Sequence, residues 1–159
     1  MTVRVTVKDH GAKRARELLK RPRKELWIGV LHEQGSQSHP SGTTIGQIAY
    51  WMEFGFDAPN GKFIWPRSWL RDWLDENEKR IGRQLAADTA RVLFGIPPES
   101  ESKALSKRGG VFRREIQQRI IGVPSNWAKL SDVTIKNKGH DAPLIETTTF
   151  GNAIRYKVK

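Results

Sequence analysis

The sequence predicts an α+β fold in which a small, mostly antiparallel sheet packs against a long helix hairpin. Three observations lead to this prediction. Segments in which apolar residues alternate with polar ones, as in half-buried strands, stand near both ends of the chain. Two consecutive segments between about residues 68 and 121 carry apolar residues at helical spacing. The 159 residues suit a single domain, 1–159, which is long enough to bury a core without disulfides.

The N-terminal part predicts a strand, a helix and a second strand. Residues 3–7 alternate valine with polar residues, and residues 12–20 place alanine and leucine on one helical face beside a basic face. Pro22 ends this helix because proline has no amide hydrogen and its ring clashes with the preceding turn. Apolar residues alternate again over 25–31, which predicts the second strand.

A polar segment and a short helix follow. Residues 32–44 contain glycine, proline and several serines, so we expect an exposed, mobile loop. Residues 45–54 carry apolar side chains at helical spacing, and Gly55 ends this helix. Residues 57–62 are rich in turn-forming residues and predict a second loop.

The helix hairpin, at about 68–121, is the clearest prediction. Its first helix begins at Ser68 as N-cap and ends near Gly95, with an apolar stripe formed by Leu70, Leu74, Ile81, Leu85 and Val92. Its second helix covers 102–121, and Gly109 lies within the apolar stripe, where a missing side chain would let another backbone approach closely. Because the connection is short, the two helices are expected to run antiparallel.

The chain ends in a second polar loop and a strand. Residues 131–143 are polar and contain glycine and proline, which predicts a loop. Residues 154–158 alternate apolar and basic side chains, so we expect a strand with one basic side.

Composition excludes several classes of protein. The chain has no cysteine, which excludes disulfides, thiol catalysis and thiolate metal sites. No segment approaches the ~18 apolar residues of a membrane span, and residues 1–10 do not look like a signal peptide. A soluble, intracellular protein is expected. There is no phosphate-binding loop, dinucleotide fingerprint or nucleophile elbow.

The sequence also gives little evidence for catalytic or metal-binding residues. The four histidines are scattered, and none has a second histidine or a carboxylate three or four residues further on. Asp72, Asp75 and Glu76 could form an acidic cluster, but Asp75 and Glu76 precede Lys79 and Arg80 by four residues, the spacing of helix ion pairs. We therefore expect a solvated helix face, no metal, no cofactor and no enzymatic activity.

Positive charge is the first indication of a partner. The formal net charge is +11, and nine basic against two acidic residues in 1–24 supply +7 of it. An excess of this kind favours a polyanion, and phosphate contacts made by such residues would be independent of base sequence. The candidates for contact with nucleic acid or an acidic partner are Lys13, Arg14, Arg16, Lys20, Arg21, Arg23 and Lys24. A second cluster comprises Lys107, Arg108, Arg113 and Arg114, and the alternative for both is an ordinary solvated surface.

Tryptophan is the second indication. Trp65, Trp69 and Trp73 are spaced four residues apart, and Trp69 and Trp73 lie roughly 100° from the apolar stripe of their helix. A second apolar face predicts a subunit interface at these three residues, because tryptophan is enriched at interfaces. Two alternatives remain open: the chain's own loop 51–63 covers them, or they stack on nucleic-acid bases.

Several short motifs occur in order along the chain: Trp27-Ile28-Gly29-Val30, Ile48-Ala49-Tyr50-Trp51-Met52-Glu53-Phe54-Gly55, Phe63-Ile64-Trp65-Pro66-Arg67-Ser68-Trp69-Leu70-Arg71, Thr134-Ile135-Lys136-Asn137-Lys138-Gly139, Pro143-Leu144-Ile145-Glu146-Thr147 and Ala153-Ile154. Their order over 27–159 resembles the tail-completion, or virion-morphogenesis, proteins of long-tailed bacteriophages. The family pattern is roughly Ile-Ala-x-x-x-Glu-Phe-Gly, Ile-Pro-x-Arg-Pro-Phe-Leu-Arg, Thr-Ile-x-x-Lys-Gly, Pro-Leu-Ile-Asp-Thr-Gly and Ser-Ile. Three departures from it matter: Thr148 (usually Gly), Ala153 (usually Ser) and Ser68-Trp69 (usually Pro-Phe).

The resemblance implies a structural role without a catalytic site or cofactor. It implies a neck subunit, similar to tail-terminator rings, that forms a homo-oligomeric ring, expected to be a hexamer, at the tail end. Its partners would be copies of itself, other neck and tail proteins and the double-stranded DNA in the channel, with no membrane. The expected location is the virion neck or tail top, after assembly in the host cytoplasm.

Two other functions remain as alternatives. One is a free, sequence-nonspecific nucleic-acid-binding protein, favoured by the net charge. The other is a nuclease or toxin that uses Lys138, His140 and Asp141.

Overall fold

The computed structural model describes residues 10–22, 24–39, 42–97, 100–130, 132, 135–136, 139 and 149–159. The strand expected over 3–7 and most of the loop expected over 131–143 lie outside these residues. The described chain mixes helices with small antiparallel sheets, which confirms the α+β prediction. Its elements are α1 (His10–Leu19), β1 (Leu26–Val30), α2 (His32–Gly35), α3 (Ile45–Phe54), β2 (Phe56–Asp57), β3 (Phe63–Ile64), α4 (Arg71–Leu93), α5 (Glu101–Gly122), α7 (Thr149–Ala153) and β4 (Ile154–Val158).

Strands β1 and β4 pair antiparallel, although one follows α1 and the other ends the chain. Leu26 lies opposite Val158 and Val30 opposite Ile154. Helix α5 covers this sheet, and the contact depends on Gly109: a Cβ added there would lie 2.5 Å from Cδ2 of Tyr156, closer than van der Waals contact allows. The close approach expected at Gly109 is therefore present, but a tyrosine ring occupies the space rather than another backbone.

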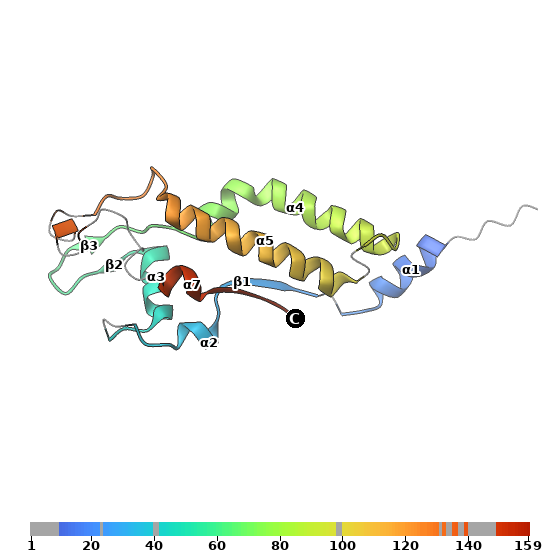
Figure 1. Ribbon diagram of the computed structural model, residues 1–159, viewed down its shortest axis with the longest axis horizontal. Coiled ribbons are helices and arrows are strands. Elements are labelled where there is room, and N and C mark those ends of the chain that lie inside the picture. The colour runs from blue at the N-terminus through green and yellow to red at the C-terminus, as the bar shows by residue number, and fades with distance from the viewer. Residues whose placement is uncertain are drawn as a thin grey trace, which may run out of the picture.

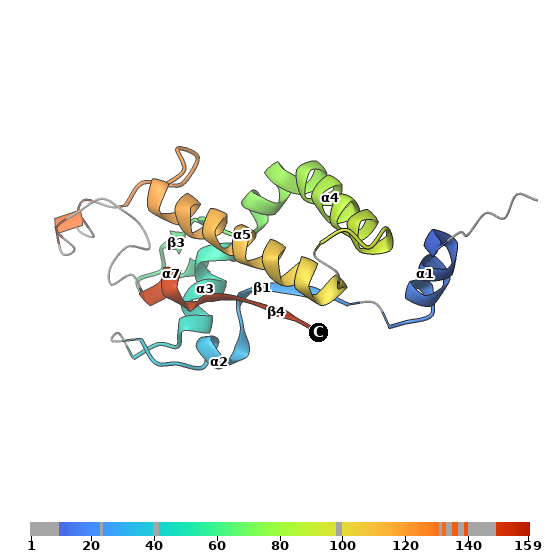
Figure 2. The same cartoon turned by 45° about the vertical axis from the view of Figure 1, so that its right-hand side comes forward.

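Helices α4 and α5 lie side by side and run in opposite directions, as expected (Figures 1 and 2). Ion pairs join them along their length. Arg108 Nη2 lies 2.8 Å from Asp88 Oδ2, Arg80 Nη2 lies 2.6 Å from Glu115 Oε2, and Arg119 pairs with Glu76. The prediction of a Glu76–Arg80 pair within one helix is wrong, because each residue has a bidentate partner on α5.

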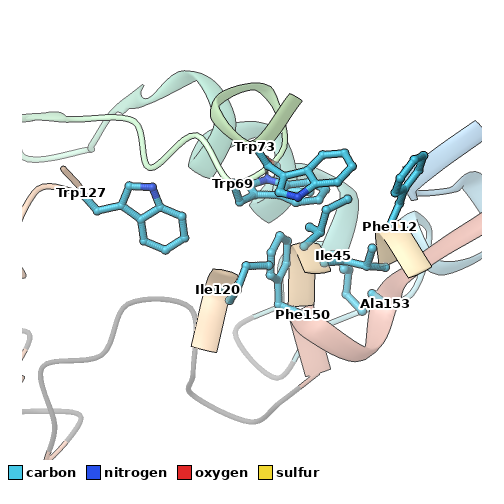
Figure 3. Packing of buried hydrophobic residues seen from close by; sticks show 11 residues of the cluster. Ile45, Trp69, Trp73, Phe112, Ile120, Trp127, Phe150 and Ala153 are labelled. Atoms are coloured by element: carbon cyan, nitrogen blue, oxygen red, sulfur yellow. Dashed lines mark hydrogen bonds between the residues drawn. The ribbon is translucent and has the colours of Figure 1, made fainter. Parts of the chain in front are cut away.

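The hydrophobic core lies between α3, the α4–α5 hairpin, α7 and β4. Ile45, Trp69, Trp73, Phe112, Ile120, Trp127, Phe150 and Ala153 belong to it (Figure 3). The predicted stripe on α4 is only partly correct. Val92 is buried and Leu70 and Ile81 pack against the core, but Leu74 is exposed while the neighbouring Trp73 is buried. Trp73 reaches Phe112 of α5 at a ring-centroid distance of 5.4 Å, and burying an indole removes more apolar surface from water than burying a leucine.

The segment predicted as a mobile loop, 32–44, is partly ordered. It contains α2 and an isolated bridge between Ser38 and Thr44. Thr44 then begins α3 with a capping box: its side chain accepts from Gln47 N, and the Gln47 side chain accepts from Thr44 N. The prediction treated these polar residues as a solvated loop, whereas one of them, Thr44, caps a helix.

The elements are distributed unevenly along the hairpin. Helix α3 and strands β2 and β3 lie toward the end where α4 begins and α5 finishes. Helix α1 lies near the opposite end, beside the turn that joins α4 to α5, and it contacts α4 (Figures 1 and 2). The two ends of the hairpin therefore carry different elements, α3 with β2 and β3 at one end and α1 at the other.

Candidate functional site

The start of α4 is held by a side chain from α3. Glu53 is buried, and its carboxylate accepts hydrogen bonds from Leu70 N at 3.1 Å and Arg71 N at 2.9 Å. These amides belong to the first turn of α4, where no intrahelical acceptor is available and negative charge is favoured. The N-cap role predicted for Ser68 is wrong. The Ser68 hydroxyl instead donates to the Glu53 carbonyl at 3.0 Å, because the carboxylate already occupies the helix end.

Three further hydrogen bonds join the same two segments. Arg67 N donates to Met52 O, the Arg71 guanidinium donates to Glu53 O, and Trp69 Nε1 donates to Ala49 O. Within the second segment, the Arg71 guanidinium also donates to Ser68 Oγ. We call this bonded unit of residues 48–55 and 63–71 the α3–α4 junction. Both of its segments are motifs on which the resemblance to tail-completion proteins rests.

Glycine is required at the end of α3. Gly55 has φ +78°, and a Cβ there would lie 2.7 Å from both Ile64 O and Phe63 Cζ. A side chain would therefore push β3 away from α3 in addition to straining the backbone. The Glu-Phe-Gly run thus supplies a helix cap, an exposed ring and a turn at successive positions.

Arg67 extends the junction to the segment after α5. Its side chain is buried and donates from Nε to Ala128 O at 3.0 Å and from Nη2 to Lys129 O at 3.4 Å. Desolvation by burial lowers the pKa of this guanidinium from its usual value. Its hydrogen bonds to backbone carbonyls hold the segment after α5 against the start of α4, which we call the Arg67 clamp.

Trp69 and Trp73 do not form a surface. They are 3% and 4% exposed, and their rings meet Phe150 of α7 and Phe112 of α5 at centroid distances of 5.2 and 5.4 Å. The prediction that these two residues form a subunit interface is therefore corrected: the chain itself covers them. The covering elements are α3, α5 and α7 rather than the loop 51–63 alone, because the chain's C-terminal segment returns to this side of α4.

Trp65 is exposed and belongs to a larger group. Tyr50, Phe54, Phe63 and Trp65, here called the aromatic patch, are 61%, 51%, 46% and 68% exposed. Tyr50 and Phe54 have ring centroids 4.8 Å apart, and Phe63 and Trp65 are 5.5 Å apart. Together the four side chains expose on the order of 400 Å² of aromatic surface, comparable to the largest apolar patch on a typical monomer, which is often a functional site.

Sequence reasoning found only Trp65 in this patch. A signal for two others was present, because Tyr50 and Phe54 lie one turn apart on the predicted helix, away from Ile45 and Ala49. Phe63 gave no such signal, since only the β2–β3 pairing brings it beside Gly55.

The predicted basic site is partly described. Lys13 and Arg16 on α1 are exposed, as are Lys20, Arg21 and Lys24 beyond it. The Arg14 side chain and Arg23 lie outside the described residues. In the second cluster Lys107 and Arg114 are exposed, but Arg108 is paired with Asp88 and Arg113 is partly buried. The N-terminal segment therefore offers more cations to a partner than the second cluster does.

The acidic cluster on α4 has cationic neighbours. Arg119 Nη2 lies 3.9 Å from Asp72 Oδ2 and also pairs with Glu76. Within the described residues no group of histidines and carboxylates is arranged to hold a metal ion, and no helix is long and apolar enough to cross a membrane. Lys138, His140 and Asp141, considered for a nuclease, lie outside the described part of the chain.

No protein-family model, curated protein or solved structure matches this chain. A function is therefore inferred from its own residues and their arrangement.

Proposed function

We propose that this chain is a structural protein of a long-tailed phage virion, a tail-completion or head–tail joining subunit that assembles as a ring at the tail end. It contacts neck or tail proteins, and its cationic segment contacts DNA or an acidic neighbour. The observation that carries the proposal is the α3–α4 junction. Two motifs that resemble those of the tail-completion proteins, separated by seven residues, are joined there by hydrogen bonds.

Four positions shared with the family pattern have structural tasks in the junction. Glu53 caps α4, Gly55 allows the turn toward β2, Arg67 clamps the segment after α5, and Arg71 bonds back to α3. Motifs that depend on one another for packing would be expected to occur together.

The Ser68-Trp69 departure is accommodated within the junction. The family pattern has Pro-Phe, and neither side chain can donate a hydrogen bond. Here the Ser68 hydroxyl bonds to Glu53 O and the Trp69 indole bonds to Ala49 O. The replacement thus keeps the second segment attached to α3 by other means. Ala153, which stands where serine is usual, is buried in the core, where a methyl group needs no partner.

Exposed groups support assembly around a polyanion. The aromatic patch supplies apolar surface of the kind that interfaces bury. The exposed cations of the N-terminal segment supply contacts that would hold phosphates without reading base sequence. In the proposed ring the subunits close around the DNA channel, and no covalent bond is made or broken.

The proposal is tested by locating the protein. Purified phage particles from the genome that encodes this chain should contain it by mass spectrometry, and labelled antibody should mark the neck or tail top by electron microscopy. Deleting the gene should leave heads and tails that fail to join or complete. Particles that lack the protein and remain infectious after the deletion would refute the proposal.

A free nucleic-acid-binding protein remains the second candidate, because the cations of α1 and the following segment are exposed. A gel-shift titration of the purified chain at several salt concentrations tests it. Tight, salt-sensitive binding by a monomer that is absent from particles would favour this function over the structural one.

A further inference from the structure

The β1–β4 sheet has one face that α5 does not cover. Helix α5 packs on the other face, where Gly109 lies against Tyr156 and Leu26 (Figures 1 and 2). Because side chains alternate along a strand, the residues at the intervening positions point away from α5. These residues, here called the sheet face, are Glu25, Trp27, Arg155, Lys157 and Lys159.

The sheet face carries positive charge that the chain does not neutralise. It holds three basic residues against one acidic residue, and no carboxylate in the described ranges lies within ion-pair distance of the three. Glu25 instead accepts a hydrogen bond from the Trp27 indole at 2.8 Å. The Arg155 guanidinium donates to the carbonyls of Asn152 and Ile154, which leaves its charge uncompensated.

Strand β4 spaces these cations regularly. Arg155, Lys157 and Lys159 stand at alternate positions, about 6.8 Å apart along an antiparallel strand. This interval is close to the separation of successive phosphates along one nucleic-acid strand. Two of the three side chains are also held in place, since Arg155 bonds to backbone and Lys159 Nζ lies 3.5 Å from the centre of the Trp27 ring.

The sheet face lies next to the exposed cations of the N-terminal segment. Lys24 directly precedes Glu25, whose N and O atoms bond to the backbone of Lys159 at 3.1 and 3.0 Å. Lys20 and Arg21, also exposed, come shortly before Lys24. Cations from the two ends of the described chain therefore meet at the start of β1 and form one continuous surface.

We propose that the sheet face binds the phosphate backbone of DNA, beside the N-terminal segment. The inference rests on the proposed function, in which DNA is the polyanion, and adds a second surface for it. Trp27 is the single apolar side chain of this face, whereas the centre of a protein–protein interface is depleted in charged residues. Phosphates, in contrast, need only positive charge at a suitable spacing.

The test is the salt dependence of DNA binding by the purified full chain. A double variant, Lys157→Gln with Lys159→Gln, is titrated with a short synthetic duplex of random sequence at about 50 to 200 mM salt. Each lost phosphate contact should reduce the slope of log K against log salt by about 0.9, so the slope should fall by about 1.8. At about 0.1 M salt the affinity should fall by roughly ten- to sixty-fold.

Two matched variants isolate the effect. Lys62→Gln with Lys79→Gln removes the same charge from exposed positions in the β2–β3 loop and on α4, and it should leave the slope nearly unchanged. Lys157→Arg with Lys159→Arg keeps the charge and should keep the affinity. Circular dichroism and the melting temperature should be retained in all of them, because the altered side chains are exposed.

Three outcomes overturn the inference. A glutamine pair at Lys157 and Lys159 that binds like the wild type would leave the sheet face to an acidic protein or to solvent. An equal loss in the Lys62 and Lys79 control would show that only net charge matters. A loss in the arginine pair as large as in the glutamine pair would exclude phosphate contact as the cause.

Failure of this site and failure of the proposed function are distinguishable. If the protein is present in particles and the glutamine pair binds DNA like the wild type, only the sheet-face site is refuted. If the glutamine pair loses affinity and the protein is absent from particles, the DNA site stands and the virion role is refuted.

Discussion

Replacing Glu53 by alanine tests the α3–α4 junction most directly. The carboxylate accepts from Leu70 N and Arg71 N, and it lies 3.7 Å from Nε of Arg71. Alanine removes all three interactions and leaves two amides at the start of α4 without the acceptor. The perturbation is therefore larger than the loss of an ordinary surface carboxylate.

The expected cost follows from these contacts. Loss of a helix cap costs about 0.5–2 kcal/mol, and a hydrogen bond to a charged group contributes about 1.5–3 kcal/mol. Water can reach part of the vacated site, so we expect the free energy of unfolding to fall by about 2–3 kcal/mol. For a domain of this size about 1 kcal/mol corresponds to a shift of about 2–4 °C, so the melting temperature should fall by about 4–12 °C.

The assay is urea unfolding of the full chain, followed by circular dichroism and tryptophan fluorescence. The midpoint should fall while the denaturant slope is unchanged, which identifies a change of stability rather than of compactness. Glu53→Gln keeps one acceptor oxygen and should fall between alanine and wild type. Glu33→Ala, on an exposed carboxylate, is the matched control and should stay within about 0.5 kcal/mol of wild type.

An unfolding midpoint for Glu53→Ala equal to that of Glu33→Ala would refute this account. It would show that the carboxylate does not hold the start of α4. The structural explanation for the paired motifs would then fail as well.

Three further outcomes are expected. Gly109→Ala should destabilise the chain by about 1–3 kcal/mol because its Cβ would overlap the Tyr156 ring, whereas Gly82→Ala, whose Cβ would meet no neighbouring group within 4 Å, should stabilise it by up to about 1 kcal/mol. If both substitutions shifted the melting temperature in the same direction, the packing at Gly109 would be contradicted. Arg67→Lys should lower the free energy of unfolding by about 1–2 kcal/mol, since an ammonium cannot reproduce the two guanidinium hydrogen bonds to carbonyls. An unchanged urea midpoint would show that Arg67 does not hold the segment after α5. Charge reversal of Arg16 and Lys20 should weaken DNA binding and reduce its salt dependence without affecting assembly; unchanged binding in a gel shift would remove the DNA role and leave assembly intact.

Local sequence signals predicted most of the elements. The helix expected over 45–54 is α3, because a capping threonine begins it and Gly55 can adopt the positive φ that ends it. The hairpin and the C-terminal strand were likewise readable from apolar spacing. Such signals depend on residues within a few positions of one another, which a sequence displays directly.

The candidate site was less predictable, because its contacts join distant parts of the chain. The spacing of Trp69 and Trp73 predicted a subunit interface, but in the structure Phe150 packs against Trp69 and Phe112 against Trp73. Glu76 had a suitable partner four residues away, yet it pairs with Arg119, 43 residues further along. Nothing within three or four residues of these side chains indicates such partners.

By itself, therefore, the sequence determined where the longer helices and the terminal strand lie, which residues are apolar and where positive charge accumulates. Only the tertiary structure decided which apolar faces the chain covers itself and which it leaves exposed. The physical reason is that propensity, capping and periodicity act over one or two turns of backbone, whereas burial depends on what the rest of the chain places opposite each side chain. Two of three evenly spaced tryptophans thus belong to the core, and the third remains at the surface beside aromatic neighbours.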